Sequence, residues 1–276
     1  MARRPASASI LNRCWLSLVI QQPKSISLFR HTLRDLRRGR HKVSVYNKVK
    51  FSPPNMSISR PDASDSTTER ILWGVGTSRT IRAHWAMHEL GLDYQSRKIQ
   101  ARTGETQTAE FSALTARQKI PLLQDRGMEI TESAAIVLYL SDTYGQAHNR
   151  LVPESPQQRA KCLEWCFFVI SELDATSLYV IRRHGDLSAV YGEAPQANLA
   201  AAEYFQKQMR TVERQLADSR SYLLDGRFGV ADILLASCIN WAVRYKVPVS
   251  ERVLAYNRNI TSRESFKRAE RSNAVA

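Results

Sequence analysis

The sequence contains no apolar run long enough to cross a membrane as a helix. A spanning helix needs roughly 18 to 20 predominantly apolar residues, whereas the most apolar early run, Ile10 to Ile20, is short and contains Arg13. We therefore predict no membrane segment and no membrane partner. The chain has 276 residues, 43% of them hydrophobic, which is enough to bury a sizeable core in one or two globular domains.

Cysteine is scarce, and its spacing gives little support to a metal site or a disulfide framework. The four cysteines, Cys14, Cys162, Cys166 and Cys238, form no C-x-x-C pair and no repeated spacing. Cys162 and Cys166 lie one turn apart on a predicted helix, with aromatic residues around them. We predict that the cysteines are small buried apolar residues in a reducing compartment, with a zinc site or a structural disulfide as the alternatives.

Acidic residues are almost absent from the first part of the chain. Residues 1–55 hold twelve Lys or Arg and a single acid, Asp35, which gives this part a net charge of +11. Residues 56–276 carry a net charge of only +3, and a surface that follows nucleic-acid phosphates would need clustered bases. We therefore predict no nucleic-acid partner.

The basic first part is expected to lie outside the fold. Its Arg- and Ser-rich composition resembles a mitochondrial transit peptide, although a solvated basic tail, a weak nuclear-import patch or upstream sequence that is not normally translated would also fit. Met56 precedes a polar linker and would be a credible true start. We expect residues 1–69 to be a leader and linker that is disordered or not native. The protein is then cytoplasmic, or mitochondrial if the leader is a genuine transit peptide.

Residues 70–150 have the pattern of a small α/β domain. Apolar runs, turn residues and helical spacing predict a strand at 71–75, a helix at 81–90, a strand at 94–99, a hairpin of strands 121–123 and 128–130, and a helix at 133–144. Asp125-Arg126-Gly127 supplies the hairpin turn. The order βαβ-ββα within one short segment predicts a thioredoxin-like domain.

The rest of the chain, residues 156–276, is predicted to be an all-α helical-bundle domain. Leu163, Phe167 and Ile170 form one apolar stripe on its first helix, and Trp165 and Phe168 widen it. Before a later apolar helix, Asp232 follows Gly229 at the spacing of a capping box. The Asp232 carboxylate can reach back to the amide of Gly229, whereas Gly229 offers no side-chain acceptor in return.

Two stretches of the α/β domain carry a family resemblance. The run from Thr77 to Tyr94 resembles the first turn and helix of bacterial and fungal glutathione transferases. The run from Lys119 to Leu123, followed by Glu132 to Ile136, is similar to the glutathione-site signature of the same family. The resemblance covers about residues 70–270 and implies the same two-domain fold. Residues 115–118 depart from the family's Asn-Pro-x-Gly stretch, which leaves the shape of that loop open.

The resemblance implies a binding role for each residue of the second stretch. The Ile120–Pro121 peptide would be cis, and the backbone of Ile120 would pair with the cysteinyl backbone of glutathione as an added strand does. Ser133, at a helix start, would bind the γ-glutamyl carboxylate, and Glu132 would pair with the neighbouring ammonium. Lys119 would bind the glycine carboxylate. The alternative is structural, with Pro121 beginning an edge strand and Glu132-Ser133 starting a helix.

Ser78 is the candidate catalytic residue. The resemblance implies that a hydroxyl or thiol after the first strand donates to the glutathione thiol and favours the thiolate, and Ser-Arg-Thr-x-Arg from Ser78 matches the pattern of a Ser-type subgroup. A free thiol with a pKa of about 8.5 is only a few per cent ionised at neutral pH. Thr77 is one residue away and remains an alternative donor, and Ser78 as a plain turn residue is another. Because this turn has no cysteine, we do not expect thiol exchange.

We therefore expect a glutathione transferase with a role in detoxification, which adds glutathione as co-substrate to a small, partly apolar electrophile. The resemblance implies a homodimer, and no metal or nucleotide is expected. One alternative is a non-catalytic module that binds glutathione or a protein. Another is a glutathione-dependent peroxidase or dehalogenase that uses the same site. Candidate lining residues for the electrophile, each with core packing as the alternative, are Trp165, Phe168, Tyr179 and Arg182.

Two patterns that resemble other sites do not complete their motifs. Gly74-x-Gly76 lacks the third glycine of a dinucleotide-binding fingerprint, because Arg79 stands in its place. His84 and His88 share a helix face at metal-ligand spacing, but no glutamate follows His84 as it does in a zinc protease. We therefore predict neither a nucleotide site nor a metal site.

Overall fold

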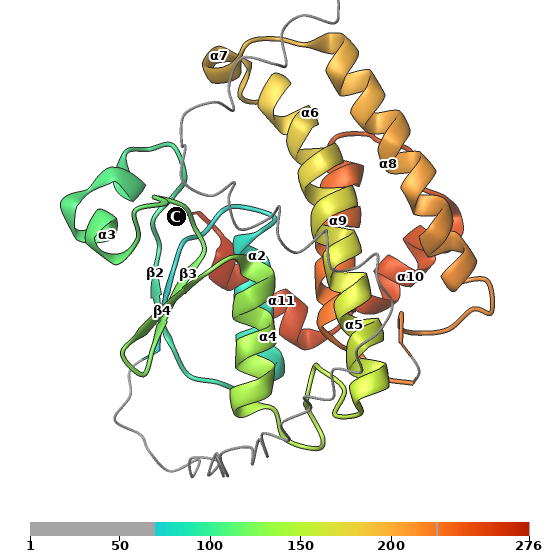
Figure 1. Ribbon diagram of the computed structural model, residues 1–276, viewed down its shortest axis with the longest axis horizontal. Coiled ribbons are helices and arrows are strands. Elements are labelled where there is room, and N and C mark those ends of the chain that lie inside the picture. The colour runs from blue at the N-terminus through green and yellow to red at the C-terminus, as the bar shows by residue number, and fades with distance from the viewer. Residues whose placement is uncertain (1–69, 225, 276) are drawn as a thin grey trace, which may run out of the picture. The chain divides into compact units, whose positions relative to one another are not determined.

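The computed structural model describes residues 70–224 and 226–275 (Figure 1). The leader and linker predicted at residues 1–69 lie outside the described residues, as do Cys14 and Met56. No helix in the described ranges is long and apolar enough to cross a membrane. The elements are, in order, β1 (Ile71–Trp73), α2 (Thr80–Glu89), β2 (Gln95–Arg97), η1 (Glu105–Gln107), α3 (Ala109–Leu114), β3 (Leu122–Asp125), β4 (Met128–Thr131), α4 (Ser133–Tyr144), α5 (Pro156–Phe168), η2 (Val169–Leu178), α6 (Tyr179–His184), α7 (Ser188–Tyr191), α8 (Pro195–Gln215), α9 (Val230–Arg244), α10 (Glu251–Thr261) and α11 (Glu264–Asn273).

The strands form one four-stranded sheet in the order β2-β1-β3-β4. β1 is parallel to β2 and antiparallel to β3, and β3 is antiparallel to β4. Arg126 and Gly127 join β3 to β4 with positive φ angles of 53° and 74°, as a two-residue type I′ turn requires. The predicted thioredoxin-like order of elements is confirmed, although β1 and β2 are shorter than the sequence pattern suggested.

The sheet separates two apolar clusters, because successive side chains of a strand point to opposite faces. Leu72 and Leu123 belong to the large cluster that includes side chains of α2 and α4. Trp73 and Leu122 point the other way and pack with Phe111 of α3, and the Trp73 and Phe111 ring centroids lie 5.6 Å apart. Helices therefore cover both faces of the sheet, as in a thioredoxin-like layer arrangement.

The first helix of the helical part buries a face that only partly overlaps the predicted one. Phe167 is 69% exposed, so its predicted place in the stripe is wrong, and Leu163 is only partly buried. Trp165 is in the core, and Phe168 and Ile170 pack against it. The side chains that reach the core are Cys162, Trp165, Cys166, Val169 and Leu173. Cys162, Trp165 and Cys166 lie on α5. Val169 and Leu173 belong to η2, whose π-helical turns are wider than those of an α-helix.

The three described cysteines, Cys162, Cys166 and Cys238, are buried and free. This confirms the prediction that they act as small apolar side chains. Burial raises the pKa of the Cys238 thiol to about 12, which keeps that thiol protonated and unreactive at neutral pH.

α9 is the central helix of the core and starts at the predicted capping box. The Asp232 carboxylate accepts hydrogen bonds from the backbone N–H of Gly229 (2.8 Å), the backbone N–H of Leu223 (2.8 Å) and the Tyr256 hydroxyl (2.5 Å). Burial raises the pKa of Asp232 to about 6. A Cβ atom on Gly229 would lie 2.7 Å from the Leu151 carbonyl oxygen. The close approach of these two backbones explains why glycine replaces the usual Ser or Thr.

Candidate functional site

A small cavity of about 130 Å³ lies where the start of α2, the loop before β3, the start of α4 and η2 meet. Its lining residues are Arg79, Arg82, Arg117, Lys119, Ile120, Pro121, Thr131, Glu132, Ser133, Ile170, Asp174 and Ala175. Five of the six site residues predicted from the sequence line this cavity, and the sixth, Ser78, does not. The structure therefore brings the predicted binding residues together and leaves the predicted catalytic residue outside the cavity wall.

The loop before β3 is shaped by a cis peptide and a close backbone contact. The Ile120–Pro121 peptide is cis, as the resemblance implied. Gly74, directly after β1, has a φ angle of 110°, and a Cβ atom there would lie 2.5 Å from the Ile120 Cβ atom. Glycine at position 74 therefore permits both the backbone angle and the approach of Ile120 to β1.

The junction between β4 and α4 places Glu132 and Ser133 at the cavity. Glu132 has φ and ψ angles of 71° and 114°, a region that non-glycine residues rarely occupy and that is often found at functional sites. Its carboxylate pairs with Arg117 at 2.5 Å, and both side chains are more than half exposed. An exposed pair of this kind contributes little stability. The Glu132 carboxylate can therefore exchange Arg117 for the ammonium of a ligand.

A buried ion cluster lies behind Ser133. Arg82 is fully buried, and its Nη2 atom lies 2.7 Å from Asp174 Oδ2. Arg79 Nη2 lies 2.5 Å from Asp174 Oδ1. Burial alone would raise the pKa of Asp174, but the charges of Arg82 and Arg79 outweigh it and hold this pKa below its usual value.

Arg82 also sets the orientation of the Ser133 hydroxyl. Arg82 Nη1 donates to Ser133 Oγ at 3.2 Å, and Arg82 Nε donates to Ser237 Oγ at 2.6 Å. Because a guanidinium can only donate, Ser133 Oγ is the acceptor and its own proton points elsewhere. That proton is available to an anionic group in the cavity, at the N-terminal end of α4.

The two candidate donors to a thiol, Thr77 and Ser78, have different surroundings. Thr77 Oγ1 accepts hydrogen bonds from the backbone N–H groups of Thr80 (3.0 Å) and Arg79 (3.3 Å), so it acts as a cap for α2. The Ser78 hydroxyl has no hydrogen-bond partner within the described part of the chain. The geometry therefore favours Ser78 over Thr77 as a hydroxyl that a ligand could use.

The loop that carries these two residues is tied to the end of α11. Asn273 Oδ1 accepts from Thr80 Oγ1 at 2.6 Å, and Asn273 Nδ2 donates to the Thr77 carbonyl oxygen at 3.3 Å. The backbone carbonyl of Asn273 accepts from the Gly76 N–H at 2.9 Å. The position of Ser78 thus depends on a residue near the far end of the described sequence.

His84 is a structural residue in this fold. Its Nε2 atom lies 3.1 Å from the Gly74 carbonyl oxygen and its Nδ1 atom lies 2.8 Å from the Tyr94 hydroxyl. A carbonyl can only accept, so Nε2 carries the proton and Nδ1 accepts from Tyr94. Burial lowers the pKa of His84 to about 4. Across residues 70–224 and 226–275, no group of three or more His, Cys, Asp or Glu could hold a metal ion.

The residues suggested for the electrophile do not form one pocket. Trp165 lines a different and larger cavity, and Phe168 packs against the core. The Tyr179 ring lies 4.3 Å from the Arg79 guanidinium carbon, beside the small cavity. η2 contributes Ile170, Asp174 and Ala175 to the cavity instead. The π-helical segment shifts the register of this helix, which a regular 3.6-residue period does not anticipate.

Arg79, Arg82, Arg117 and Asp174 are the site residues that sequence reasoning missed. Arg79 and Arg82 belong to the stretch that carries the family resemblance. The sequence therefore contained both arginines in a recognised segment but did not indicate which carboxylate they pair with. Asp174 pairs with them from 95 and 92 residues away, and no local pattern indicates such a pairing.

Two family models match the chain. They are "Glutathione S-transferase, N-terminal domain" at residues 69–142 and "Glutathione S-transferase, C-terminal domain" at residues 184–271. Together they cover the α/β part and most of the helical part, in the order that the fold shows.

Individual relatives are distant. Glutathione S-transferase D7 of Drosophila melanogaster is 36% identical over 91 residues, which is 33% of this chain and 41% of that protein. The probable maleylacetoacetate isomerase 2 of the same organism is 26% identical over 219 residues, which is 77% of this chain and 92% of that protein. A theta class glutathione S-transferase from Xanthomonas axonopodis pv. citri, solved with glutathione bound, superposes with a TM-score of 0.62 and 25% identity over 75% of this chain and 98% of that one.

Proposed function

The chain belongs to the glutathione transferase family, and on this basis we propose that it activates the thiol of glutathione as a thiolate and adds it to an electrophilic, partly apolar small molecule. The observation that carries the proposal is the convergence of Lys119, Ile120, Pro121, Glu132 and Ser133 on one cavity. Solved structures of similar fold contain bound glutathione or its disulfide, which supports glutathione as the ligand.

Each polar group of glutathione has a chemically suitable partner in the proposed complex. The γ-glutamyl carboxylate accepts from the Ser133 hydroxyl and from the amides at the start of α4. The ammonium pairs with Glu132 once Arg117 is displaced, and Lys119 pairs with the glycine carboxylate. Ile120 lies in a loop, and neither its N–H nor its C=O forms a backbone hydrogen bond within the described residues. They are therefore available to the cysteinyl backbone, as in strand addition.

Ser78 is the proposed donor to the thiol. Its hydroxyl is free of the capping bonds that engage Thr77, and it precedes the N-terminal end of α2, where negative charge is stabilised. Lowering the thiol pKa from about 8.5 to about 6.5 would require roughly 2.7 kcal/mol of preferential stabilisation of the thiolate. Activation and positioning of the nucleophile, with the electrophile bound beside Tyr179, would then account for the reaction.

Glu132→Ala combined with Ser133→Ala should abolish retention on immobilised glutathione, because it removes the partners of both charged groups at the γ-glutamyl end. We expect calorimetry to show at least a tenfold weaker affinity, since charge-assisted hydrogen bonds are worth about 1.5–3 kcal/mol each. Glu203→Ala with Ser188→Ala is the matched control, because neither residue lines the cavity. Equal binding by the folded site variant and this control would refute the site assignment.

Ser78→Ala separates catalysis from binding within the same proposal. The variant should retain glutathione, lose at least tenfold in turnover of chlorodinitrobenzene, and show a higher pKa for the bound thiol in its ultraviolet absorbance. The position of Ser78 outside the cavity wall favours a second candidate, a module that binds glutathione without turnover. That candidate gains support if the wild-type protein binds glutathione but shows neither turnover nor thiolate absorbance. An unchanged rate and thiolate absorbance in Ser78→Ala would instead exclude Ser78 as the donor.

We also propose that the protein is a homodimer. Phe167 on α5 exposes 69% of its surface, and a second copy would remove this ring from water. Phe167→Asp should shift the sedimentation coefficient towards that of a monomer, because a dimer would bury the new charge. Val190→Asp, at another exposed apolar position, is the control that should leave the dimer intact. A wild-type protein that sediments as a monomer at micromolar concentration would exclude the dimer.

A further inference from the structure

A group of tyrosine rings and guanidinium groups, the tyrosine–arginine cluster, borders the glutathione cavity. Arg79 lines the cavity, and the ring of Tyr179, the first residue of α6, lies 4.3 Å from its guanidinium carbon. Arg102 approaches from the loop after β2, and its Nη2 atom donates to the Tyr179 hydroxyl at 3.4 Å. The cluster therefore begins at the cavity wall and joins the α/β part to the helical part.

Tyr191 and Arg183 complete the cluster at its exposed end. Arg102 Nη1 donates to the Tyr191 hydroxyl at 3.4 Å, and the Arg102 guanidinium carbon lies 5.3 Å from the centroid of that ring. The Arg183 guanidinium carbon lies 4.5 Å from the same centroid. The hydrogen bond from Arg102 and the charges of both arginines hold the pKa of Tyr191 below its ordinary value. Tyr191 is thus in contact with two cations at once.

Neither Arg102 nor Arg183 has an acidic partner. Within the part of the chain that the structure describes, no carboxylate lies within salt-bridge distance of either guanidinium. The acids that follow them three positions later are engaged elsewhere. Glu105 accepts hydrogen bonds from its own loop, and Asp186 accepts from the Tyr245 hydroxyl at 2.6 Å. The cluster therefore carries two positive charges that no acid of the described chain neutralises.

Both sides of the cluster are held in defined positions. His184 Nδ1 lies 2.9 Å from the Gly192 carbonyl oxygen, and because a carbonyl can only accept, Nδ1 carries the proton. This bond fixes the end of α7, where Tyr191 lies. On the other side, Arg102 has a φ angle of 70°, which non-glycine residues rarely adopt and which is often found at functional sites.

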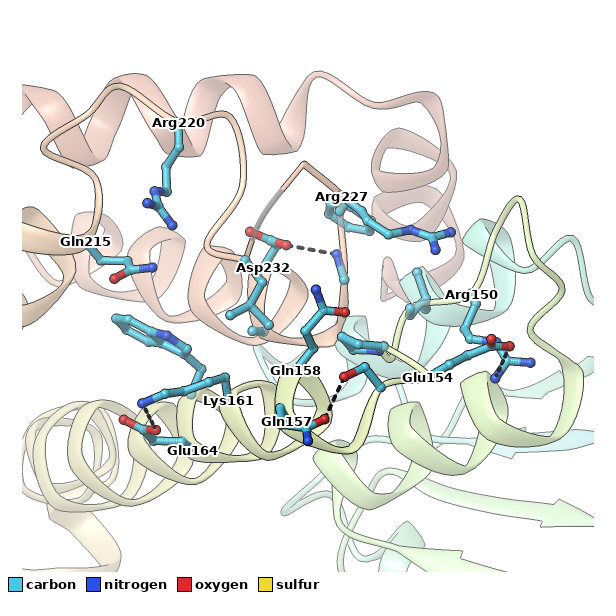
Figure 2. A pocket seen from close by; sticks show the side chains of 18 of the residues that line it. Arg150, Glu154, Gln157, Gln158, Lys161, Glu164, Gln215, Arg220, Arg227 and Asp232 are labelled. Atoms are coloured by element: carbon cyan, nitrogen blue, oxygen red, sulfur yellow. Dashed lines mark hydrogen bonds and ion pairs between the residues drawn. The ribbon is translucent and has the colours of Figure 1, made fainter.

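The larger cavity of the helical part does not offer another place for the electrophile. It measures about 770 Å³ and lies between α5, the end of α8 and the start of α9 (Figure 2). It shares no lining residue with the glutathione cavity and contains no residue of the tyrosine–arginine cluster. Reacting atoms have to approach within about 3–3.5 Å of each other. The electrophile therefore has to border the glutathione cavity, as the cluster does.

The chemistry of the cluster selects for a flat anion. A guanidinium presents its donors in a planar fork that matches a carboxylate. The rings of Tyr179 and Tyr191 offer faces against which a conjugated or aromatic body can pack. The hydrogen bonds from Arg102 to the two tyrosine hydroxyls, each 3.4 Å long, exceed the usual length. A carboxylate can therefore replace these neutral acceptors.

We propose that the electrophile of the transferase reaction is a conjugated or aromatic carboxylate, with its carboxylate bound by Arg102 and Arg183 and its unsaturated body beside Tyr179. The inference rests on the proposed function, because the glutathione thiolate supplies the nucleophile after its proton has passed to water. With an aryl chloride, a C–S bond forms at the carbon that bears the chlorine. The C–Cl bond breaks, and chloride leaves with the bonding electron pair.

The test compares two electrophiles of the same shape, a chlorodinitrobenzoate and the corresponding neutral chlorodinitrobenzamide, in which the chlorine stands between the nitro groups and para to the carboxylate or carboxamide. Each kcat/KM is divided by the rate constant of the uncatalysed reaction with glutathione, which removes the difference in intrinsic reactivity. The wild-type protein should favour the benzoate about tenfold or more, because only the benzoate forms charge-assisted pairs.

Arg102→Gln with Arg183→Gln should abolish this preference. We expect a KM for the benzoate that is about tenfold higher with kcat almost unchanged, because pairs made far from the reacting carbon stabilise ground state and transition state alike. The values for the benzamide should stay within about twofold of the wild type. Arg210→Gln with Arg252→Gln, two exposed positions on α8 and α10, is the control with the same loss of charge and should leave both electrophiles unchanged.

Three outcomes would overturn the proposal. They are a wild-type protein without preference for the benzoate, an unchanged KM for the benzoate in the variant of Arg102 and Arg183, and an equal loss for both electrophiles in that variant. The last outcome would mean that the arginines only maintain the structure, and circular dichroism shows whether the variant is folded.

Binding of dinitrobenzoate, which has no leaving group, separates this inference from the proposed function. Calorimetry should show that the variant of Arg102 and Arg183 binds dinitrobenzoate about tenfold more weakly than the wild type and the control do. A protein that binds no glutathione and turns over neither electrophile refutes the proposed function, while this measurement still tests the carboxylate site. Equal affinity of the wild type and the variant for dinitrobenzoate would refute the carboxylate site, whatever the outcome for glutathione.

Discussion

Replacement of Asp174 by alanine should lower the free energy of unfolding by about 3–5 kcal/mol, since removal of one partner from a buried ion pair leaves the other charge uncompensated. Arg82 has no exposed surface, and its Nη2 atom lies 2.7 Å from Asp174. Its other donors reach only neutral acceptors, Ser133, Ser237 and Cys238. Those hydrogen bonds cannot replace the charge of the carboxylate. Urea denaturation followed by circular dichroism measures the loss.

A second variant distinguishes the lost charge from lost packing. Asp174→Leu combined with Arg82→Met removes both charges and keeps apolar volume, so it should recover most of the stability that Asp174→Ala loses. Asp142→Ala is the surface control, because Asp142 and Arg159 are paired at 2.6 Å but each exposes more than a third of its side chain. It should lower the unfolding free energy by at most about 1 kcal/mol. If Asp174→Ala is no more destabilising than Asp142→Ala, the buried ion cluster does not stabilise the fold.

His84 should make its own contribution to the pH dependence of stability, opposite in sign to that of Asp232, whose raised pKa of about 6 makes the folded state bind a proton as the pH falls. Burial lowers the pKa of His84 to about 4, whereas a histidine in the unfolded chain has a pKa of about 6.5. Between these two values the unfolded state binds a proton at this histidine that the folded state does not, so the contribution of His84 to stability falls as the pH decreases. The contribution is complete above pH 6.5. It is lost by about pH 4, with a total of about 3 kcal/mol.

His84→Gln should remove this contribution and leave the opposite one of Asp232, because glutamine keeps a donor for the Gly74 carbonyl and has no group that titrates in the range. The measurement is the urea midpoint at several pH values between 4 and 7, compared between the variant and the wild-type protein. His148→Gln, at an exposed position, should leave the wild-type slope unchanged. A slope that is identical in wild type and His84→Gln would assign the acid sensitivity to other groups.

Local sequence patterns predicted most of the α/β part, because each of its elements is specified within a few residues. The hairpin follows from two apolar runs around Arg126-Gly127, and the start of α4 follows from Glu132-Ser133. The binding residues were predicted from the family resemblance of short stretches of sequence, and not from the local patterns alone. Patterns of this kind predict elements and not the contacts between distant ones.

The sequence pattern failed where tertiary contacts or an irregular helix decide the outcome. Phe167 was assigned to the core from its apolar character, yet the face occupied by Cys162 and Cys166 is the one that packs against α9. Asp174 becomes a site residue only because η2 brings it to α2, in a segment whose π-helical turns depart from the expected period. The 770 Å³ cavity depends on three separated segments, and no local pattern indicates it.

The hydrogen bonds of Asn273 have a consequence for how this fold can be recombined. Asn273 holds the Thr77–Thr80 loop from 193 positions further along the chain, and Arg263 of the same terminal region pairs with Glu89 at 2.6 Å. A chimaera that joins this α/β part to the helical part of another family member would lose the contacts made by Asn273, Arg263 and Asp174. An exchange at the domain boundary would therefore separate the loop of Ser78 from the residues that position it, and both parts have to be matched for this loop to keep its place.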